Sequence, residues 1–512
     1  MATRIGRFFT HKTVLAIEAV FAAFAPLFFY ACRSSSHVFL DTALFSGFSQ
    51  LLFWLMAANA IAVTTEAALK WRKTSFADEV PKPMTAICGV SFAATAIFAV
   101  TDIVMLIVMG GESAPVAFRS ISEMLPYAFG YVAVAFFAIF FPVVKGKTAR
   151  RVTAAVTIAI GIFGAVFALY PPTAYEFLSD PMVIDTGSGY SVVFATSDTG
   201  TGYVEYEYDG ESYRVYDQNN GRIRGSSTIH SINVPYEHLD NNSYSVGSTR
   251  VYEEYAYGGR NGRTIESEEY LFTPCRGETQ TYLCISDWHT HTDAAKDAIA
   301  HTGEFDAVLM MGDAVPGLQY EEEAAVYIVQ FGGDISGGTK PIIYTRGNHE
   351  TRGAYASELA DALGLDRFYG TVQAGDYRFV VLDSAEDKTD DHPEYGGLAD
   401  YGAYRKKITE WVETLTEGGR TVVLCHAPEI FIEQDLTDRT VTALRGIGAT
   451  MMISGHLHTC YLDENGPVYV DGGFNGGKYV ASRVTLSPDG IGLYACDNHG
   501  ETVLEEHIDW IA

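Results

Sequence analysis

The chain has 512 residues and is acidic, with 63 Asp and Glu residues against 35 Lys and Arg residues and a formal net charge of −28. This length exceeds one typical domain and suggests about three. So acidic a chain repels the phosphate backbone of DNA and RNA, which argues against a nucleic-acid partner but leaves room for small phosphorylated substrates.

Long apolar stretches dominate the first third of the chain. Each is close to the roughly 20 residues that a helix needs to span a hydrocarbon layer. Together they predict a five-span transmembrane domain over residues 1–172, with spans at Thr13–Cys32, Ala43–Thr64, Ile87–Met109, Tyr127–Val144 and Val152–Tyr170. Four stretches follow the first, which argues against a cleavable signal peptide. The expected location is therefore the cell membrane, crossed several times.

Basic residues set the expected orientation of these spans. They gather at the N-terminus, between the second and third stretches, and before the fifth stretch at Lys145, Lys147, Arg150 and Arg151. Basic loops tend to stay on the cytoplasmic side of a membrane. The N-terminus is thus expected in the cytoplasm, and five crossings would place everything after Tyr170 outside it.

A β-rich segment follows at residues 181–274. Ser191–Thr196, Gly202–Tyr208 and Tyr270–Thr273 have the composition of strands, and Gly, Asn and Asp residues typical of turns separate them. The segment is predicted to form a small all-β sandwich.

Five short motifs carry the residues with metal-binding chemistry, and each comes directly after an apolar run with strand character. The runs are Thr281–Ser286, Ala307–Met311, Pro341–Tyr344, Thr421–Leu424 and Thr450–Ile453. The motifs are Asp287-Trp288-His289, Gly312-Asp313, Gly347-Asn348-His349-Glu350, Cys425-His426 and Gly455-His456-Leu457-His458. Their carboxylate, amide and imidazole groups bind metal ions. Because the carboxyl ends of parallel strands meet at one edge of a sheet, the motifs are expected to converge into a two-metal centre.

This ordered set of motifs resembles the calcineurin-like metallophosphoesterase superfamily, from Thr281 to the C-terminus. The resemblance implies that residues 278–512 form an αββα-type α/β sandwich, which hydrolyses phosphate esters with a hydroxide that bridges two metal ions. One ion would be held by Asp287, His289 and His458. The other would be held by Asn348, His426 and His456, with Asp313 as the bridge, while His349 and Glu350 would be catalytic rather than ligands.

The chemistry of these residues agrees with that assignment. Two cations about 3.5–4 Å apart can clamp a phosphoryl group and acidify a water molecule. Glu350 is expected to orient the imidazole of His349, which would stabilise or protonate the leaving oxygen. The ligand types suit Mn, Fe or Zn and do not choose among them.

Three residues beside the motifs are candidate substrate contacts: His291, Arg346 and Arg352. An arginine at such a place can hold a phosphate oxygen through its two-pronged guanidinium. The alternative for both arginines is a salt bridge to Glu350 or to the acidic loop Glu386–Asp400, and the alternative for His291 is a solvated loop position.

The β-rich segment is similar to the fibronectin-like domain that precedes the catalytic domain in purple acid phosphatases. The motifs depart from that group, because His289 stands two residues after Asp287 and no tyrosine stands three residues after Asp313. An Fe(III)–tyrosinate centre is therefore not expected.

These observations predict a multi-domain protein: an α-helical membrane domain, a fibronectin-like β-sandwich at 181–274 and an α/β metallophosphoesterase sandwich. Its expected function is hydrolysis of a phosphorylated small-molecule or lipid-linked substrate by a membrane-anchored, extracytoplasmic domain. The alternative is a membrane receptor or transporter whose phosphatase-like domain only binds a phosphorylated ligand.

Overall fold

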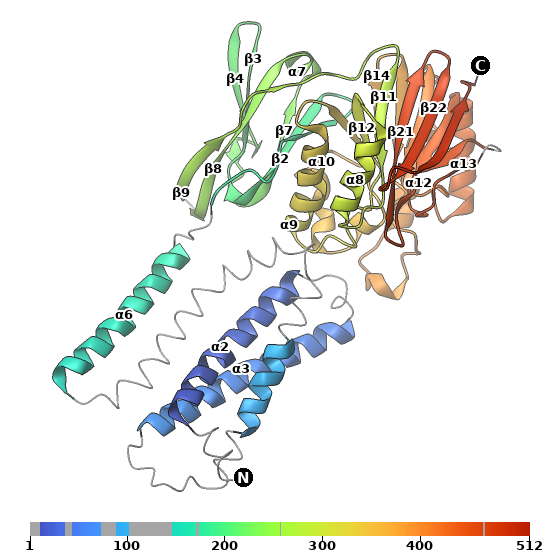
Figure 1. Ribbon diagram of the computed structural model, residues 1–512. Coiled ribbons are helices and arrows are strands. Elements are labelled where there is room, and N and C mark those ends of the chain that lie inside the picture. Colours follow the sequence, from blue (N-terminus) through green and yellow to red (C-terminus); the bar gives the residue numbers. More distant parts are fainter. Residues whose placement is uncertain are drawn as a thin grey trace. The chain divides into compact units, whose positions relative to one another are not determined.

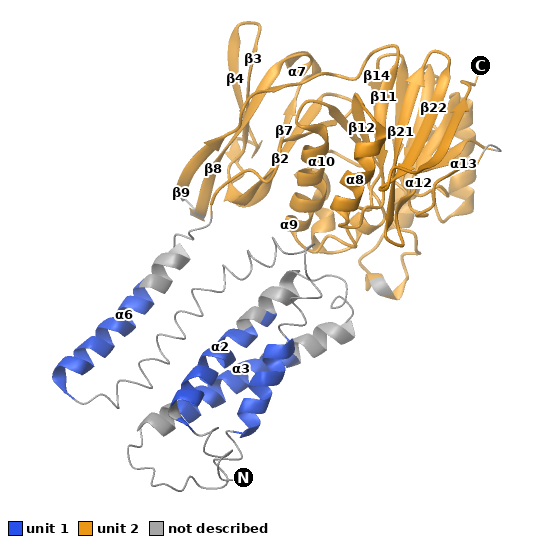
Figure 2. Ribbon diagram, in the orientation of Figure 1, with its two compact units in different colours: residues 1–173 blue, residues 174–512 orange. Residues whose placement is uncertain are grey.

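The structure is a computed structural model of the chain (Figure 1). It describes residues 11–35, 43–72, 89–101, 146–169, 174–255, 258–463 and 466–511. The chain divides into two compact units, residues 1–173 and residues 174–512 (Figure 2).

The first unit contains long helices, among them α2 (Lys12–Ser35), α3 (Ala43–Arg72) and α6 (Lys147–Leu169). Small side chains let α2 and α3 approach closely, with Ala19 and Ala22 against Ala60 and Val63. Polar groups are also buried in this unit: the Ser91 hydroxyl donates a hydrogen bond to Glu66 at 2.9 Å.

The prediction of a membrane domain is contradicted. Within the ranges that the structure describes, none of the helices has the length and apolar character needed to cross a bilayer. The predicted α-helical membrane domain over residues 1–172 and the multi-pass cell-membrane location are therefore wrong. The prediction weighed the lengths of apolar stretches, whereas α2 carries Glu18 within its apolar stretch and α6 begins with Lys147, Arg150 and Arg151. The predicted span Tyr127–Val144 and most of Ile87–Met109 lie outside the described residues.

The second unit is built on two sheets. The larger has the strand order β23-β22-β21-β11-β12-β13-β1-β2-β8-β3-β4, with β7, β9, β10 and β20 attached at its side. Its first strands are β1 (Met182–Asp185), β2 (Tyr190–Gly200), β3 (Tyr203–Tyr208), β4 (Glu211–Tyr216), β7 (Ser227–Val234), β8 (Ser243–Tyr255), β9 (Gly258–Glu266) and β10 (Tyr270–Leu271). Its later strands are β11 (Gln280–Ile285), β12 (Ala307–Met310), β13 (Pro341–Tyr344), β20 (Gly473–Asn475), β21 (Lys478–Ser487), β22 (Gly490–Asp497) and β23 (Thr502–Ile508).

The β-rich segment at 181–274 is continuous with this sheet. Its strand β1 pairs in parallel with β13, Val183 opposite Pro341 and Ile184 opposite Ile342. Met182, Val183 and Ile184 are all buried, so both faces of β1 are covered by other parts of the unit. The segment also carries the short strands β5 (Gln218–Asn219) and β6 (Arg222–Ile223) and the single-turn helix α7 (Tyr236–Leu239). The boundaries predicted for the separate domains remain a prediction.

The smaller sheet has the order β14-β15-β16-β17-β19-β18. Its strands are β14 (Gly370–Ala374), β15 (Tyr377–Leu382), β16 (Arg420–Cys425), β17 (Ala449–Ser454), β18 (Tyr461–Asp463) and β19 (Val468–Val470). One hydrophobic core joins it to the larger sheet, and within that core the rings of Tyr282 on β11 and Phe379 on β15 lie 5.1 Å apart. The two sheets therefore pack face to face.

Helices cover the outer faces of both sheets. The larger sheet carries α8 (Thr292–Thr302), α9 (Glu321–Ala324), a π-helical turn (Ala325–Gln330) and α10 (Phe331–Ser336), and α8 and α10 lie over β12 in Figure 1. The smaller sheet carries α12 (Tyr401–Val412) and α13 (Gln434–Gly446), whose Ile408 and Leu444 share a core with Val423 of β16. Shorter helical turns connect these elements: His349–Thr351, Ala354–Ser357, α11 (Leu359–Ala362) and Pro393–Tyr395. The result is a mixed helix–sheet–sheet–helix arrangement.

Candidate metal centre

The five motifs lie at the carboxyl ends of strands from both sheets. The larger sheet supplies the residues after β11, β12 and β13, and the smaller sheet supplies those after β16 and β17. The expectation of a single sheet edge is therefore replaced by a site between two packed sheets. Within each set the strands run parallel, so their carboxyl ends meet at one edge of their own sheet. Donor groups from both edges come together in the clusters described below.

The backbone at this site is unusual. Five of the predicted ligand residues have positive φ: Asp287 at 51°, His289 at 38°, Asp313 at 57°, His456 at 71° and His458 at 50°. Residues other than glycine rarely adopt this conformation, and it tends to persist where the surrounding structure enforces it for function. Sharp turns after the strands thus aim these side chains inward.

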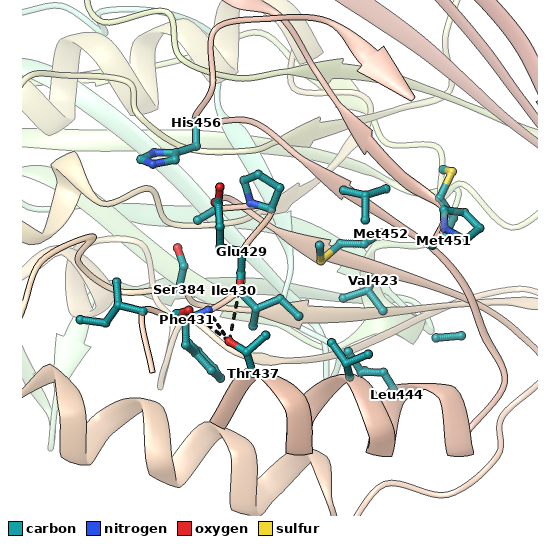
Figure 3. Close-up of a pocket in the computed structure, with 18 of the residues that line it drawn as sticks. Ser384, Val423, Glu429, Ile430, Phe431, Thr437, Leu444, Met451, Met452 and His456 are labelled. Atoms are coloured by element: carbon teal, nitrogen blue, oxygen red, sulfur yellow. Dashed lines mark hydrogen bonds between the residues drawn. The ribbon is translucent and has the colours of Figure 1, made fainter. Parts of the chain in front are cut away.

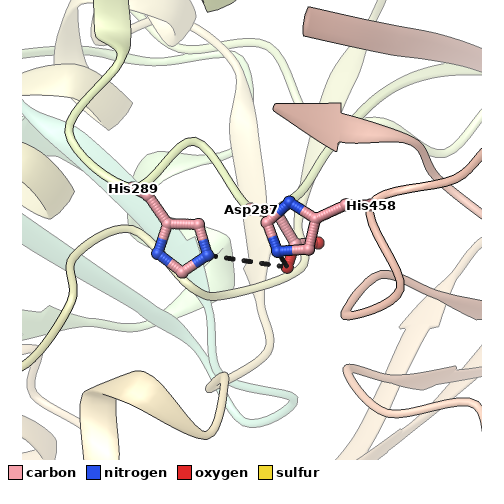
Figure 4. Close-up of side chains that lie close together, drawn as sticks. All are labelled: Asp287, His289 and His458. Atoms are coloured by element: carbon pink, nitrogen blue, oxygen red, sulfur yellow. Dashed lines mark ion pairs between the residues drawn. The ribbon is translucent and has the colours of Figure 1, made fainter. Parts of the chain in front are cut away.

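One group of donor atoms comprises Asp287, His289 and His458 (Figure 4). Asp287 Oδ1 lies 3.4 Å from His458 Nε2 and 4.0 Å from His289 Nε2. The two imidazole rings stack at 5.1 Å with an angle of 5° between their planes. All three side chains thus present an electron pair to the same small space.

A second group comprises Asp313, His426 and His456. Asp313 Oδ2 lies 3.2 Å from His426 Nε2 and 3.8 Å from His289 Nε2, so this carboxylate faces both groups. The end of the Asn348 amide that faces the group lies 3.1 Å from His456 Nδ1. The predicted ligands are thus brought together, and their individual ligand roles remain a prediction.

Hydrogen bonds to backbone carbonyls orient two of the imidazoles. His426 Nδ1 donates to the Met311 carbonyl at 2.6 Å, and His458 Nδ1 donates to the Phe474 carbonyl at 2.5 Å. Histidines that bind metals typically donate their other ring N–H in this way, which fixes the tautomer. Nε2 of both residues therefore faces the site, where it can coordinate a metal ion.

Two further observations fit a cation at this place. Asp287 Oδ1 is buried and has no hydrogen-bond donor in the part of the chain that the structure describes. The inward end of the Asn348 amide also lies 3.3 Å from both Asp313 Oδ2 and His426 Nε2. With its nitrogen inward the amide donates hydrogen bonds to these atoms, and with its oxygen inward it is a ligand for a cation bound among them.

Burial and neighbouring charges shift the pKa values of two histidines of the cluster in opposite directions. Burial, together with the imidazoles of His349 and His458, lowers the pKa of His289 to about 3, although Asp313 opposes the change. Burial also disfavours a charged His426, but the carboxylates of Asp313 and Asp287 outweigh it and raise its pKa to about 10. Without a cation, His426 therefore carries a proton that metal binding would release.

Glu350 was expected to orient the imidazole of His349, but its hydrogen bonds go to other groups. Its buried carboxylate accepts hydrogen bonds from three backbone amides, those of Asp313 (2.9 Å), Ala314 (2.5 Å) and Gly347 (2.8 Å). Burial, with the nearby carboxylate of Asp313, raises the pKa of Glu350 to about 7. This side chain ties the loop after β12 to the loop after β13, and so holds two of the ligand-bearing loops together.

Replacing Glu350 with glutamine should destabilise the protein and weaken metal binding. The amide NH2 would face backbone N–H groups that need an acceptor, and an unsatisfied buried group costs about 1–3 kcal/mol. Denaturant unfolding and metal titration measure the two effects. Glu358→Gln, at an exposed position, is the matched control. Equal stability of the Glu350 and Glu358 variants would contradict this role.

The candidate substrate contacts have other partners. Arg346 is buried and bonds Asp383 at 2.6 Å, with its guanidinium over the ring of Phe368. Arg352 makes a two-pronged bond to Glu386 at 2.7 and 2.8 Å. For Arg352 this is the salt bridge to the acidic loop, which the sequence analysis gave as the alternative to substrate contact. His291 stacks on Phe474 at 3.7 Å. Substrate contact by these residues remains a prediction.

Sequence reasoning missed Asp471, which follows β19. It is fully buried and accepts a hydrogen bond from Ser286 at 3.0 Å, directly before Asp287. Burial raises its pKa to about 8. The available signal was its place after the apolar run Val468–Val470, the same pattern that identified the five motifs.

Comparisons with known proteins bear on the same region. Residues 281–460 match the family model described as calcineurin-like phosphoesterase. No curated protein matches the sequence. A predicted phosphoesterase from Streptococcus pneumoniae TIGR4 is 15% identical, with a TM-score of 0.22 over 45% of this chain and 98% of its own. A cold-active protein-tyrosine phosphatase of a psychrophile Shewanella sp. is 12% identical, with a TM-score of 0.25 over 66% of this chain and 100% of its own.

The family match spans the loops after β11, β12, β13, β16 and β17, which carry the metal-binding groups described above. Fold position, donor set and family model thus agree for this part of the chain. The chain contains a calcineurin-like metallophosphoesterase domain at residues 281–460.

Proposed function

We propose that the chain hydrolyses phosphate esters at a dinuclear metal centre. One ion is assigned to Asp287, His289 and His458, and the other to Asn348, His426 and His456, with Asp313 between them. The observation that carries this proposal is the convergence of buried acceptor atoms, with Asp313 Oδ2 3.2 Å from His426 Nε2 and 3.8 Å from His289 Nε2.

Each residue of the site is assigned a separate role in the proposed hydrolysis. When bound, two such cations neutralise charge on the phosphoryl oxygens and lower the pKa of water. Asp313 has two carboxylate oxygens: Oδ1 accepts the His349 backbone N–H at 2.9 Å, and Oδ2 faces the histidines. Asn348 contributes a neutral oxygen, which limits the negative charge of the site. His349 is assigned the transfer of a proton to the leaving oxygen, because its Nε2 lies at the same carboxylate, 3.8 Å from Asp313 Oδ2.

The substrate is proposed to be a small phosphorylated molecule rather than a nucleic acid. A net charge of −28 disfavours a long polyanion, whose many phosphates would all be repelled. A single phosphate group experiences mainly the local field of the site, which the metal ions dominate. The metals are drawn from Mn, Fe and Zn, all of which suit mixed oxygen and imidazole ligands.

Metal removal tests the proposal. Dialysis against a chelator should abolish turnover of an aryl phosphate and lower the melting temperature, and Mn, Fe or Zn should restore both. A ligand at 100 times its dissociation constant stabilises the folded state by about 2.7 kcal/mol. Calorimetry and a colorimetric phosphate assay measure the two effects. Full turnover without metal would refute the metal centre, and restored stability with no turnover of any ester would favour the binding-only alternative.

A further inference from the structure

A large cavity opens beside the metal centre. It has a volume of about 950 Å³ and lies between α13 and the strands β16 and β17. Figure 3 shows His456 and Met451 at opposite ends of its lining, with Met452 and Val423 between them. The cavity is at the upper end of the roughly 300–1,000 Å³ that is usual for small-molecule sites.

The cavity is continuous with the metal centre. Asn348 and His456, two of the proposed ligands, also line its near end, and Ala449 and Pro467 line its far end. β17 runs from Ala449 to Ser454, and five steps of extended chain cover about 17 Å before the turn that carries His456. The cavity is thus elongated along the strands, and it is much longer than a phosphate group requires.

Apolar side chains form the middle of the cavity. They come from the sheet (Val423 and Met452), from the loop after β16 (Ile430 and Phe431) and from α13. The α13 residues Thr437, Val441 and Leu444 recur at spacings of three and four, so one face of the helix lines the cavity. Methionine adapts its shape to varied apolar partners.

Charged lining residues stand only at the two ends among the described residues. Glu386, Asp387 and Glu429 lie at the end nearest the metal centre, and Arg445 lies at the far end. Arg352 already neutralises Glu386 through its two-pronged ion pair. A phosphate has no partner in the middle of this cavity, and burying it there would be costly. The part of a ligand that fits is uncharged and apolar.

We propose that this cavity binds the hydrocarbon chain of a phosphate ester whose phosphate group lies at the metal centre. The substrate class is then phosphate esters with a long hydrocarbon chain, and this rests on the hydrolytic function proposed above. The chain extends from the metal centre along β17 and packs beneath α13. Val441 is the residue that sets how far it reaches, because it lies midway along the cavity-facing stripe of α13.

A series of alkyl phosphates from butyl to dodecyl, turned over by the metal-loaded full chain, tests the proposal. Burial of each additional CH2 is expected to lower KM about fourfold, the equivalent of about 0.8 kcal/mol, until the cavity is filled. The value of kcat should stay nearly constant, because a remote chain binds the ground state and the transition state alike. Isothermal titration with the matching alkylphosphonates, which are not hydrolysed, provides a readout that is independent of turnover.

Val441→Trp should fill the middle of the cavity and flatten the dependence on chain length beyond butyl. Thr442→Trp is the matched control, because Thr442 is the next residue of α13 and is exposed. Val441→Phe is a smaller change that serves if the tryptophan variant melts early. A flat chain-length series in the unmodified protein, or equal effects at positions 441 and 442, would overturn the proposal. Chain-dependent phosphonate binding without turnover of any ester would instead count against the hydrolytic function and leave the cavity assignment standing.

Discussion

Replacing Asp313 with asparagine is expected to abolish hydrolysis of phosphate esters and to remove at least one metal ion. Its carboxylate is the group that lies between the two donor clusters, 3.2 Å from His426 Nε2 and 3.8 Å from His289 Nε2. An asparagine has one oxygen for these contacts and no negative charge to offset the ions. Loss of partners outside the ligand set typically costs 10–100-fold, so a bridging ligand should cost more than about 100-fold.

Metal analysis and turnover of an aryl phosphate measure these two effects. Asp306→Asn is the matched control, because Asp306 precedes β12 and so lies at the end of that strand opposite to Asp313. Its carboxylate accepts a hydrogen bond from the Thr281 backbone N–H at 2.9 Å. The control should keep both ions and full turnover. An Asp313→Asn protein with two equivalents of metal and normal turnover would rule out the bridging role.

The strands that carry the motifs could be predicted to within a residue or two. The predicted run Pro341–Tyr344 is identical to the observed strand. The predicted run Thr421–Leu424 is one residue shorter at each end than the observed strand Arg420–Cys425. These runs are short, apolar and rich in β-branched residues, and buried parallel strands have that composition. Because strands of both sheets are buried on both faces, the same pattern describes either sheet, and their division into two sheets could not be predicted.

Pairings between distant parts of the chain were beyond the reach of local patterns. Nothing near Met182–Asp185 indicates that this strand pairs with Pro341–Tyr344, because the choice of partner depends on the packing of the whole unit. The partners of buried charged side chains could not be predicted from local patterns either. Arg346 bonds Asp383 and Arg352 bonds Glu386, each more than 30 residues away, and Glu350 turned out to hold backbone amides.

The helical unit shows the limit of composition as a guide. Helices form at Lys12–Ser35 and Lys147–Leu169, where apolar stretches were predicted, so local helix propensity was interpreted correctly. Their interpretation as membrane spans is contradicted, because none of the helices in the described residues has the length and apolar character needed to cross a bilayer. Helix length and apolar character are separate properties. The sequence indicated helices of sufficient length, and this was wrongly interpreted as enough apolar character to cross a membrane.

Replacing His349 with alanine is expected to lower kcat about 10²–10⁴-fold, the usual range for a group that transfers a proton in the transition state. Its Nδ1 donates to the Pro316 carbonyl at 2.9 Å, which holds the ring so that Nε2 faces the site. The loss should be larger for an alkyl phosphate, whose leaving oxygen needs a proton, than for a nitrophenyl phosphate, whose leaving oxygen does not. Steady-state kinetics with both substrates measure this difference.

The geometry also allows a rival role for His349. Its ring nitrogen groups with His289 and Asp313 as closely as the proposed ligands do with one another, so it could bind a metal ion itself. Metal content separates the two roles, because an acid can be removed without loss of either ion and a ligand cannot. His301→Ala, at the last turn of α8, is the control and should change neither quantity. An equal loss of rate for both leaving groups, together with the loss of one metal ion, would assign His349 to the ligand set and leave proton transfer to water.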